Sequence, residues 1–240
     1  MIKRINNFLL KAENFILPES CLACRQTGQA LCPACRALIK KIPERCPACG
    51  RGQNLGFFCS ACAPLSNEVF FDGLIAYGDY QDRILARAIK AMKYQGVQKL
   101  GKMLGKMLGR RLIEHWRLSS AKAPDSTPIL MPIPLHPRRY RRRGFNQSLL
   151  IAAGISEKTG WPINEGLKRK SWQKPSAGLT YEQRRRQEKI FHYQGPSLQK
   201  QQIILVDDVV TTGATVQAAS RTLKSAGAEL VLAAVLAQSL

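Results

Sequence analysis

Long apolar stretches are missing from this 240-residue sequence. No segment reaches the roughly 18 continuous apolar residues that a membrane span needs. The first twenty residues hold a short apolar patch at 8–10, but Lys11 and Glu13 interrupt the run, so no signal-peptide core forms. We therefore expect a cytoplasmic protein without a membrane span, and we interpret residues 1–20 as an amphipathic lead-in helix.

Acidic residues are also scarce. The chain has 16 Asp and Glu residues against 37 Lys and Arg residues, which gives a formal net charge of +21. A positive field of this size attracts polyanions, namely nucleic acid, anionic lipid or phosphorylated small molecules. The alternative is a protein that is merely basic, and we rank it second because the excess is large.

Cysteine is absent from the sequence after residue 62, because all eight cysteines lie between residues 21 and 62. They form four C-x-x-C pairs: Cys21/Cys24, Cys32/Cys35, Cys46/Cys49 and Cys59/Cys62. Each pair lets one turn offer two thiolates to a tetrahedral ion, and eight thiolates suit two Zn²⁺ ions. Disulfides are unlikely in a cytosolic chain, and four clustered copies are not typical of a redox motif. We assign the first four cysteines to one ion and the last four to the other, with a crossed pairing left open.

A short apolar strand ending in two acids is the most informative stretch of the sequence. Residues 203–206 are four aliphatic residues, typical of a buried strand of a parallel sheet. Asp207 and Asp208 follow, then a Thr/Gly turn, and Thr215 opens a helical pattern. Backbone amides and hydroxyls at such a helix N-terminus hold a phosphate. An ordinary strand–helix corner with an acidic cap would explain one acid and one threonine, but not both acids and the whole turn.

The run LVDDVVTTGATV at 205–216 closely resembles the PRPP-binding motif of type I phosphoribosyltransferases. The resemblance implies that Asp207 and Asp208 are the catalytic-site acids that hold the ribose hydroxyls of phosphoribosyl pyrophosphate (PRPP), with Mg²⁺ as the cofactor. It also implies a loop around the 5′-phosphate, formed by Val210, Thr211, Thr212, Gly213, Ala214 and Thr215.

A second run, PIPLHPRRYRRRGFNQS at 132–148, narrows the family. Together with the four C-x-x-C pairs and the PRPP motif, it resembles the ComF family of competence and DNA-uptake proteins over roughly residues 21–240. In the type I fold the corresponding loop faces the pyrophosphate, which implicates Arg143, Gly144, Asn146 and Gln147. The five arginines between residues 138 and 143 are more than one pyrophosphate needs. The surplus suits the phosphate backbone of single-stranded DNA, with Tyr140 and Phe145 available for base stacking. The nucleic-acid candidates are Arg138, Arg139, Tyr140, Arg141 and Arg142, and an exposed basic turn is the alternative for the first two arginines.

The segment 168–191 is rich in basic residues and lacks a clear apolar period. In the type I fold the segment in this position is a lid that closes over the pyrophosphate, which implicates Lys174, Arg184, Arg185 and Arg186. The family usually shows an Arg followed by an Asn in the lid, whereas this segment contains no Asn.

We predict an α/β fold, a type I phosphoribosyltransferase-like twisted, mostly parallel sheet flanked by helices, with an N-terminal zinc-ribbon module. The predicted parts are a lead-in helix at 1–20, a double zinc ribbon at 21–64 and the phosphoribosyltransferase-like domain at 65–240. The resemblance implies a ComF-like protein for DNA uptake that binds single-stranded DNA and PRPP. The alternatives are an active phosphoribosyltransferase of nucleotide metabolism, and a zinc-ribbon adaptor that docks a helicase or another DNA-uptake protein.

Overall fold

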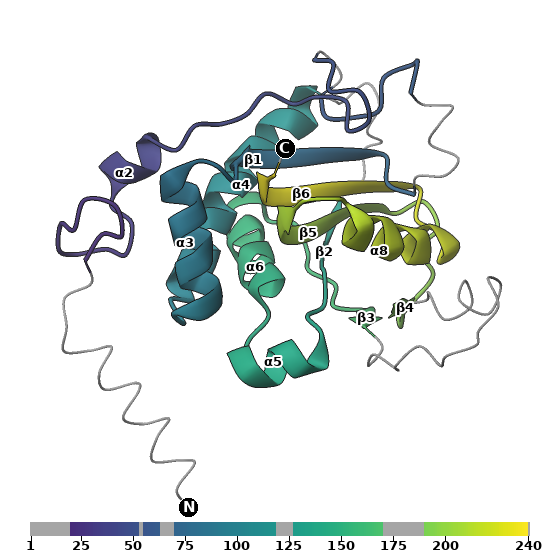
Figure 1. The fold of residues 1–240 in the computed structure, drawn as a ribbon. Coiled ribbons are helices and arrows are strands. Elements are labelled where there is room, and N and C mark those ends of the chain that lie inside the picture. The colour runs from purple at the N-terminus through teal and green to yellow at the C-terminus, as the bar shows by residue number, and fades with distance from the viewer. Residues whose placement is uncertain (1–19, 53–54, 63–69, 119–126, 170–189, 240) are drawn as a thin grey trace, which may run out of the picture.

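The structure is a computed structural model that describes residues 20–52, 55–62, 70–118, 127–169 and 190–239. Figure 1 shows the arrangement of the helices and strands. The predicted lead-in helix, except for residue 20, lies outside the described residues. The four predicted lid residues also lie outside them: Lys174, Arg184, Arg185 and Arg186.

Four parallel strands form the central sheet, in the order β1-β6-β5-β2. The strands are β1 (Gly73–Asp79), β2 (Ile129–Pro132), β5 (Gln202–Val210) and β6 (Leu230–Gln238). Val206 of β5 lies opposite Pro132 of β2 and Ala234 of β6. Both faces of the sheet are covered, so its inner strands are nearly continuous apolar runs. The predicted α/β class with a mostly parallel sheet is confirmed.

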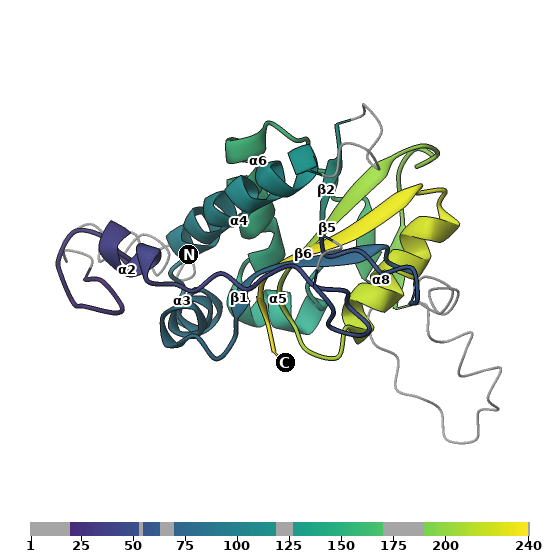
Figure 2. The same cartoon turned by 90° about the horizontal axis from the view of Figure 1, so that it is seen from above.

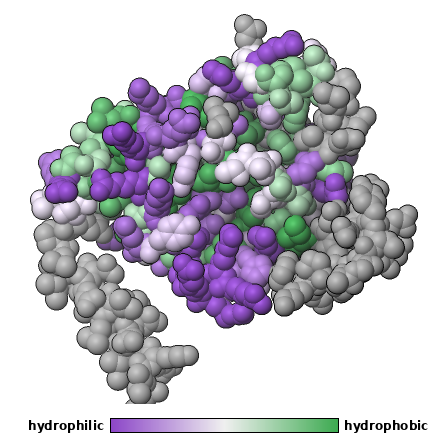
Figure 3. Space-filling model, viewed as in Figure 1, coloured by the Kyte–Doolittle hydropathy of each residue, from purple (hydrophilic) through white to green (hydrophobic). Residues whose placement is uncertain are grey.

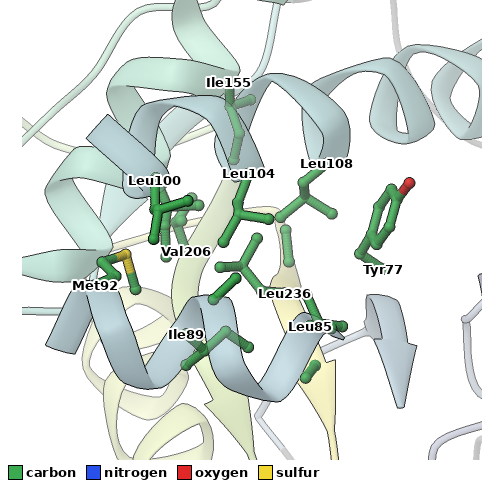
Figure 4. Packing of buried hydrophobic residues seen from close by; sticks show 14 of the residues in the cluster. Tyr77, Leu85, Ile89, Met92, Leu100, Leu104, Leu108, Ile155, Val206 and Leu236 are labelled. Atoms are coloured by element: carbon green, nitrogen blue, oxygen red, sulfur yellow. The ribbon is translucent and has the colours of Figure 1, made fainter. Parts of the chain in front are cut away.

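Helices cover both faces of this sheet (Figures 1 and 2). The helices α3 (Arg83–Tyr94), α4 (Lys99–Leu118) and α6 (Gln147–Thr159) share one core with Ile204 and Val206 of β5. The helix α8 (Ala214–Ser225) packs on Ile203, Leu205 and Val210 of β5, beside the antiparallel pair of β3 (Leu167–Arg169) and β4 (Phe191–Tyr193). Figure 4 shows Met92, Leu100 and Leu104 packed toward Val206 and Leu236. Among the described residues, every helix is too short or too polar to cross a bilayer.

Glycines allow α4 and α6 to cross at close range. A Cβ atom at Gly105 would lie 2.2 Å from the carbonyl oxygen of Ile151, and one at Gly154 would lie 2.1 Å from that of Lys102. The lysines of the same repeat in α4 point outward, where Lys102 and Lys106 approach Glu157 at 3.1 and 2.8 Å. In the repeat at 101–108 the glycines therefore pack against α6, and the lysines form a solvated charged face.

The cysteine-containing segment runs along the outer edge of β1, and includes the short helix α2 (Pro33–Ala37). Lys41 forms an antiparallel bridge with Gly78, near the end of β1, and Phe57 forms one with Gly73, at its start. The first four cysteines therefore lie near the end of β1, beside α3, and the last four near its start (Figure 1). Arg111 of α4 anchors the segment between them, because its guanidinium donates to the Ile42 and Tyr77 carbonyls and pairs with Glu44. The division of the chain at residue 64 stays a prediction.

Candidate phosphate site and metal centres

Two adjacent carboxylates occupy the carboxyl end of β5, and each has its own partners. Asp207 Oδ1 accepts hydrogen bonds from Ser148 Oγ and from the Asp208 backbone, both at 2.9 Å. Asp208 is buried, and its Oδ1 accepts from the Val209 backbone at 2.8 Å. Its Oδ2 lies 2.6 Å from Lys93 Nζ of α3. The two acids are thereby held by different helices, Asp207 by α6 and Asp208 by α3.

The environment of Asp207 favours its protonated form. Burial raises the pKa of this carboxyl to about 7, with the negative charge of Asp208 as the second cause. The hydrogen bonds from the Asp208 backbone and Ser148, and the charge of Lys93, act in the opposite direction but are weaker. Asp207 is therefore close to half-protonated at neutral pH, so it can give up or take a proton when a ligand binds.

The segment after the acids forms an exposed turn at the N-terminus of α8. Val210 is buried as the last residue of β5, so the predicted phosphate loop begins inside the strand. Thr211 and Thr212 are exposed, and Gly213 has a φ of +74° as the N-cap of α8, with no capping side-chain hydrogen bond. The last two predicted loop residues, at 214 and 215, form the first turn of the helix and are exposed. The Ala214 N–H makes a long hydrogen bond of 3.4 Å to Thr212 Oγ1. The N-terminus of this twelve-residue helix is exposed, and its backbone N–H groups can bind an anion there.

The arginine run forms a short helix, α5 (Pro137–Arg143), that the sequence did not predict. His136 caps it by accepting a hydrogen bond from the Arg138 backbone, and Gly144, with a φ of +84°, ends it. Figure 3 shows hydrophilic residues gathered over α5. The five predicted nucleic-acid residues are all exposed on this helix: Arg138, Arg139, Tyr140, Arg141 and Arg142.

The four residues predicted on the pyrophosphate side divide into two kinds. Asn146 and Gln147 are structural, since Asn146 caps α6 and donates to the Ile133 carbonyl at 3.1 Å, and Gln147 is buried. Arg143 is half-buried, donates to Gln147 Oε1, and stacks over the Tyr94 ring at 5.5 Å from its centroid. Gly144 supplies the turn between α5 and α6. Arg143 is therefore the charged member of the set, and it lines a cavity together with Lys93.

A cavity of about 540 Å³ separates the end of α3 from α5. The residues that line it are Lys93, Tyr94, Gly96, Arg139, Arg142, Arg143 and Phe145. Lys93 also pairs with Asp208, so the cavity adjoins the acid pair.

The cysteines form two groups of four, in each of which the Sγ atoms lie within 4.8 Å of one another. The groups are Cys21, Cys24, Cys32 and Cys35, and then Cys46, Cys49, Cys59 and Cys62. The groups repeat each other in detail: the Cys32 backbone donates to Cys21 Sγ, and the Cys59 backbone to Cys46 Sγ, both at 3.4 Å. Four thiols at such separations are the donor set of a structural zinc site. The chain therefore pairs the first four and the last four cysteines, as predicted, and each group could hold a zinc ion.

Backbone donors lower the pKa of one thiol in each group. Burial raises the pKa of the Cys21 thiol, but the N–H groups of Cys24, Cys32 and Ala23 outweigh it and lower the pKa to about 6. Cys46 is in the same situation in the second group, with its pKa also lowered to about 6. Zinc binds thiolates, so these donors favour the metal-binding form.

The chain is similar in sequence to several known proteins. The phosphoribosyl transferase domain family matches residues 166–239, which include β5, the exposed turn and α8. The chain is 28% identical over 207 residues to competence protein ComFC of Bacillus subtilis, a match that covers 83% of this chain and 80% of the relative. It is 28% identical over 218 residues to competence protein F of Haemophilus influenzae, with 87% and 92% covered. This confirms the resemblance to the ComF family.

Two further similarities extend this comparison. The ComF resemblance includes the DNA utilization protein YhgH of Escherichia coli O157:H7, which is 28% identical over 223 residues, with 90% of this chain and 95% of the relative covered. Among solved structures, the allosteric regulatory enzyme of purine biosynthesis aligns with 56% of this chain at 20% identity and a TM-score of 0.39. The chain spans about a quarter of that enzyme's length, since 25% of it is covered.

Three residues of this site were not identified from the sequence. Lys93 is one of several basic residues in its helix, and Ser148 ends the run at 132–148. Arg169 of β3 is half-buried, and burial lowers its pKa, followed by the charge of Arg139, whereas Asp207 raises it. All three reach the site from segments that only the folded sheet brings together. The position of Lys93 in the last turn of a helix that follows β1 was the available signal.

Proposed function

We propose that this protein binds PRPP at the end of β5 and single-stranded DNA at α5, as a cytoplasmic component of DNA uptake in natural transformation. The observation that carries the proposal is the turn at 211–213, whose exposed threonines precede the N-terminus of a twelve-residue helix next to two carboxylates. The names of the relatives, competence and DNA utilization proteins, support the biological setting.

Each part of PRPP has a suitable partner in this arrangement. The 5′-phosphate would receive hydrogen bonds from the turn and from the first N–H groups of α8. Asp207 is the acid available to the ribose hydroxyls, because Asp208 is held by Lys93. The carboxylate oxygens are hard donors that suit Mg²⁺, which would supply charge neutralisation at the diphosphate. Arg143 would face the pyrophosphate, together with the lid residues Lys174, Arg184, Arg185 and Arg186.

Calorimetric titration of Mg²⁺ and PRPP into the full chain tests this proposal. The matched variant is the double substitution Asp207→Asn and Asp208→Asn, which keeps the volume of both side chains and removes their charge. We expect micromolar binding by the wild type and none by the variant. Absence of binding by the wild type, at a Tm that indicates a folded protein, would overturn the PRPP proposal.

Single-stranded DNA would bind through the exposed cations of α5. A net charge of +21 adds long-range attraction for any polyanion. Neutralising Arg138, Arg139, Arg141 and Arg142 together should weaken binding of an oligonucleotide and flatten the dependence of its affinity on salt concentration. Equal affinity and an equal salt slope in the variant would remove the role that we give α5.

An active phosphoribosyltransferase is the second candidate, and one observation favours it. The pKa of Asp207, raised to about 7 by burial and then by Asp208, makes this carboxyl able to accept a proton from an attacking nitrogen near neutral pH. The other contributions would be orientation and stabilisation of charge by the surrounding cations. Release of pyrophosphate from PRPP with one of a panel of nucleobases, lost on Asp207→Asn, would establish this activity.

A further inference from the structure

The cavity between α3 and α5 is surrounded by positive charge. Lys93 comes from α3, and Arg139, Arg142 and Arg143 come from α5. None of the described residues that line the cavity is acidic. Lys93 is paired with Asp208, but the three arginines repel one another, and an anion bound among them would remove that repulsion. The cavity is therefore suited to a ligand that carries negative charge.

Two of these cations are held in place by buried groups. Lys93 Nζ lies 2.6 Å from a carboxylate whose side chain is only 7% exposed, that of Asp208. Arg143 donates to Gln147, which is buried, and lies over the ring of Tyr94. Cations held by such partners lose less conformational entropy when a ligand arrives. The neighbouring Arg138 and Arg141 are on the same helix, but they do not line the cavity.

The cavity also contains aromatic surface. Tyr94 is 67% exposed beside the cations, and Phe145 forms a buried part of the wall. A volume of about 540 Å³ lies within the range of pockets that enclose a ligand the size of a nucleotide. Exposed aromatic rings next to arginines are the usual platform for nucleobases.

We infer that the α3–α5 cavity is a binding site for a 5′-phosphorylated nucleotide, with its phosphate among the four cations and its base against Tyr94. The nucleotide is either free or the 5′ end of single-stranded DNA. For the DNA end, this inference rests on the proposed DNA binding at α5 and narrows it from a charged face to a defined cavity. The cavity is distinct from the turn before α8 that would hold the 5′-phosphate of PRPP. It shares Arg143 with the pyrophosphate side of the proposed PRPP site, so the two ligands would compete for this residue.

The test measures binding of three probes to the full chain: dAMP, a 5′-phosphorylated six-residue oligothymidylate and its 5′-hydroxyl counterpart. A charged hydrogen bond contributes about 1.5–3 kcal/mol, so we expect the phosphorylated oligomer to bind about tenfold or more tightly than the hydroxyl form if the DNA end is the ligand. Arg142→Gln should abolish this preference. Arg141→Gln, on the same helix but outside the cavity, should weaken both oligomers alike and keep the preference.

The outcomes with dAMP separate the two sources. Binding of dAMP that is lost on Arg142→Gln or Tyr94→Ala, and retained on Arg110→Gln of α4, supports the site with a free nucleotide as its ligand. The titration is made without PRPP, so it reports on the cavity whether or not PRPP itself binds. The inference is overturned if dAMP does not bind and the oligomers show no 5′-phosphate preference.

Discussion

Asp207 should make the stability of the protein depend on pH. Burial, followed by the charge of Asp208, raises the pKa of this carboxyl to about 7, whereas an Asp in an unfolded chain has a pKa of about 3.9. Between these pH values the folded protein binds more protons than the unfolded chain, so the free energy of unfolding falls as pH rises. Asp207→Asn removes this cost, and we expect the Tm of the variant to exceed that of the wild type at pH 8.

The comparison at lower pH is the control for this prediction. At pH 5 Asp207 is already protonated in the folded state, so the difference in Tm between the two proteins should shrink. Calorimetric scans from pH 5 to pH 8 measure it. A variant that is equally destabilised at every pH would show that the charge of Asp207 is not the source of the pH dependence.

Arg111 holds the cysteine-containing segment against the sheet. Arg111 is 7% exposed, and its guanidinium binds the carbonyls of Ile42 and Tyr77 and the carboxylate of Glu44. Arg111→Met removes this donor from the partly buried Ile42 carbonyl and Glu44 carboxylate, whereas the Tyr77 carbonyl keeps the Ile42 N–H. We expect the free energy of unfolding to fall by about 1–3 kcal/mol. Urea denaturation measures the loss. Arg110→Met, at the exposed neighbouring position, should change it by less than about 0.5 kcal/mol.

The crossing of α4 and α6 depends on the missing side chains of two glycines. At Gly105 and Gly154 a methyl group would meet a backbone carbonyl at 2.2 and 2.1 Å, so the helices would have to move apart. We expect Gly105→Ala and Gly154→Ala each to lower the free energy of unfolding by about 1–3 kcal/mol, despite the better helix propensity of Ala.

Gly109→Ala is the graded control on the same helix. Its nearest contact would be at 3.2 Å, which a small shift relieves, and the higher helix propensity of Ala compensates. Its stability should stay within about 1 kcal/mol of the wild type. Equal losses at all three positions would contradict the role that we give to the closest backbone contacts, those at Gly105 and Gly154.

Elements with local sequence signals were predictable, and elements formed by long-range contacts were not. The apolar run at 203–206 predicted a strand, and the Thr/Gly turn after Asp208 predicted a helix N-terminus, because in each case the signal lies in consecutive residues. The helix α5 was missed because five arginines carry no apolar period that would indicate a buried face. The contact of Lys93 with Asp208 depends on how α3 docks on the sheet, which no local pattern encodes.

The two cysteine groups should stabilise different ends of β1. The first group packs into the core with α3, and the second lies where Phe57 bridges Gly73. Cys24→Ser and Cys49→Ser each remove one exposed ligand, and we expect each variant to retain one zinc ion per chain where the wild type holds two. Zinc content by elemental analysis and amide hydrogen exchange are the measurements.

The exchange pattern distinguishes the two variants. Cys24→Ser should increase exchange in α3 and near Gly78, and Cys49→Ser should increase it near Gly73, because metal binding supplies folding free energy locally. Identical exchange patterns in both variants would contradict separate roles for the groups, and wild-type protein without zinc would contradict the metal assignment.

In the described part of the chain, both outer strands of the sheet are partly covered. The outer side of β2 is paired at Leu130, which donates to the Pro162 carbonyl and accepts from the Asn164 backbone. The outer side of β1 is paired at both ends by the cysteine-containing segment, through Lys41 and Phe57. An uncovered edge strand recruits strands from other molecules and leads to aggregation. The segment that pairs with β2 follows directly after α6. The segment that pairs with β1 instead has a cysteine group at each end. Metal starvation would therefore expose one edge of the sheet, and chains made without metal would associate through β1 before they unfold.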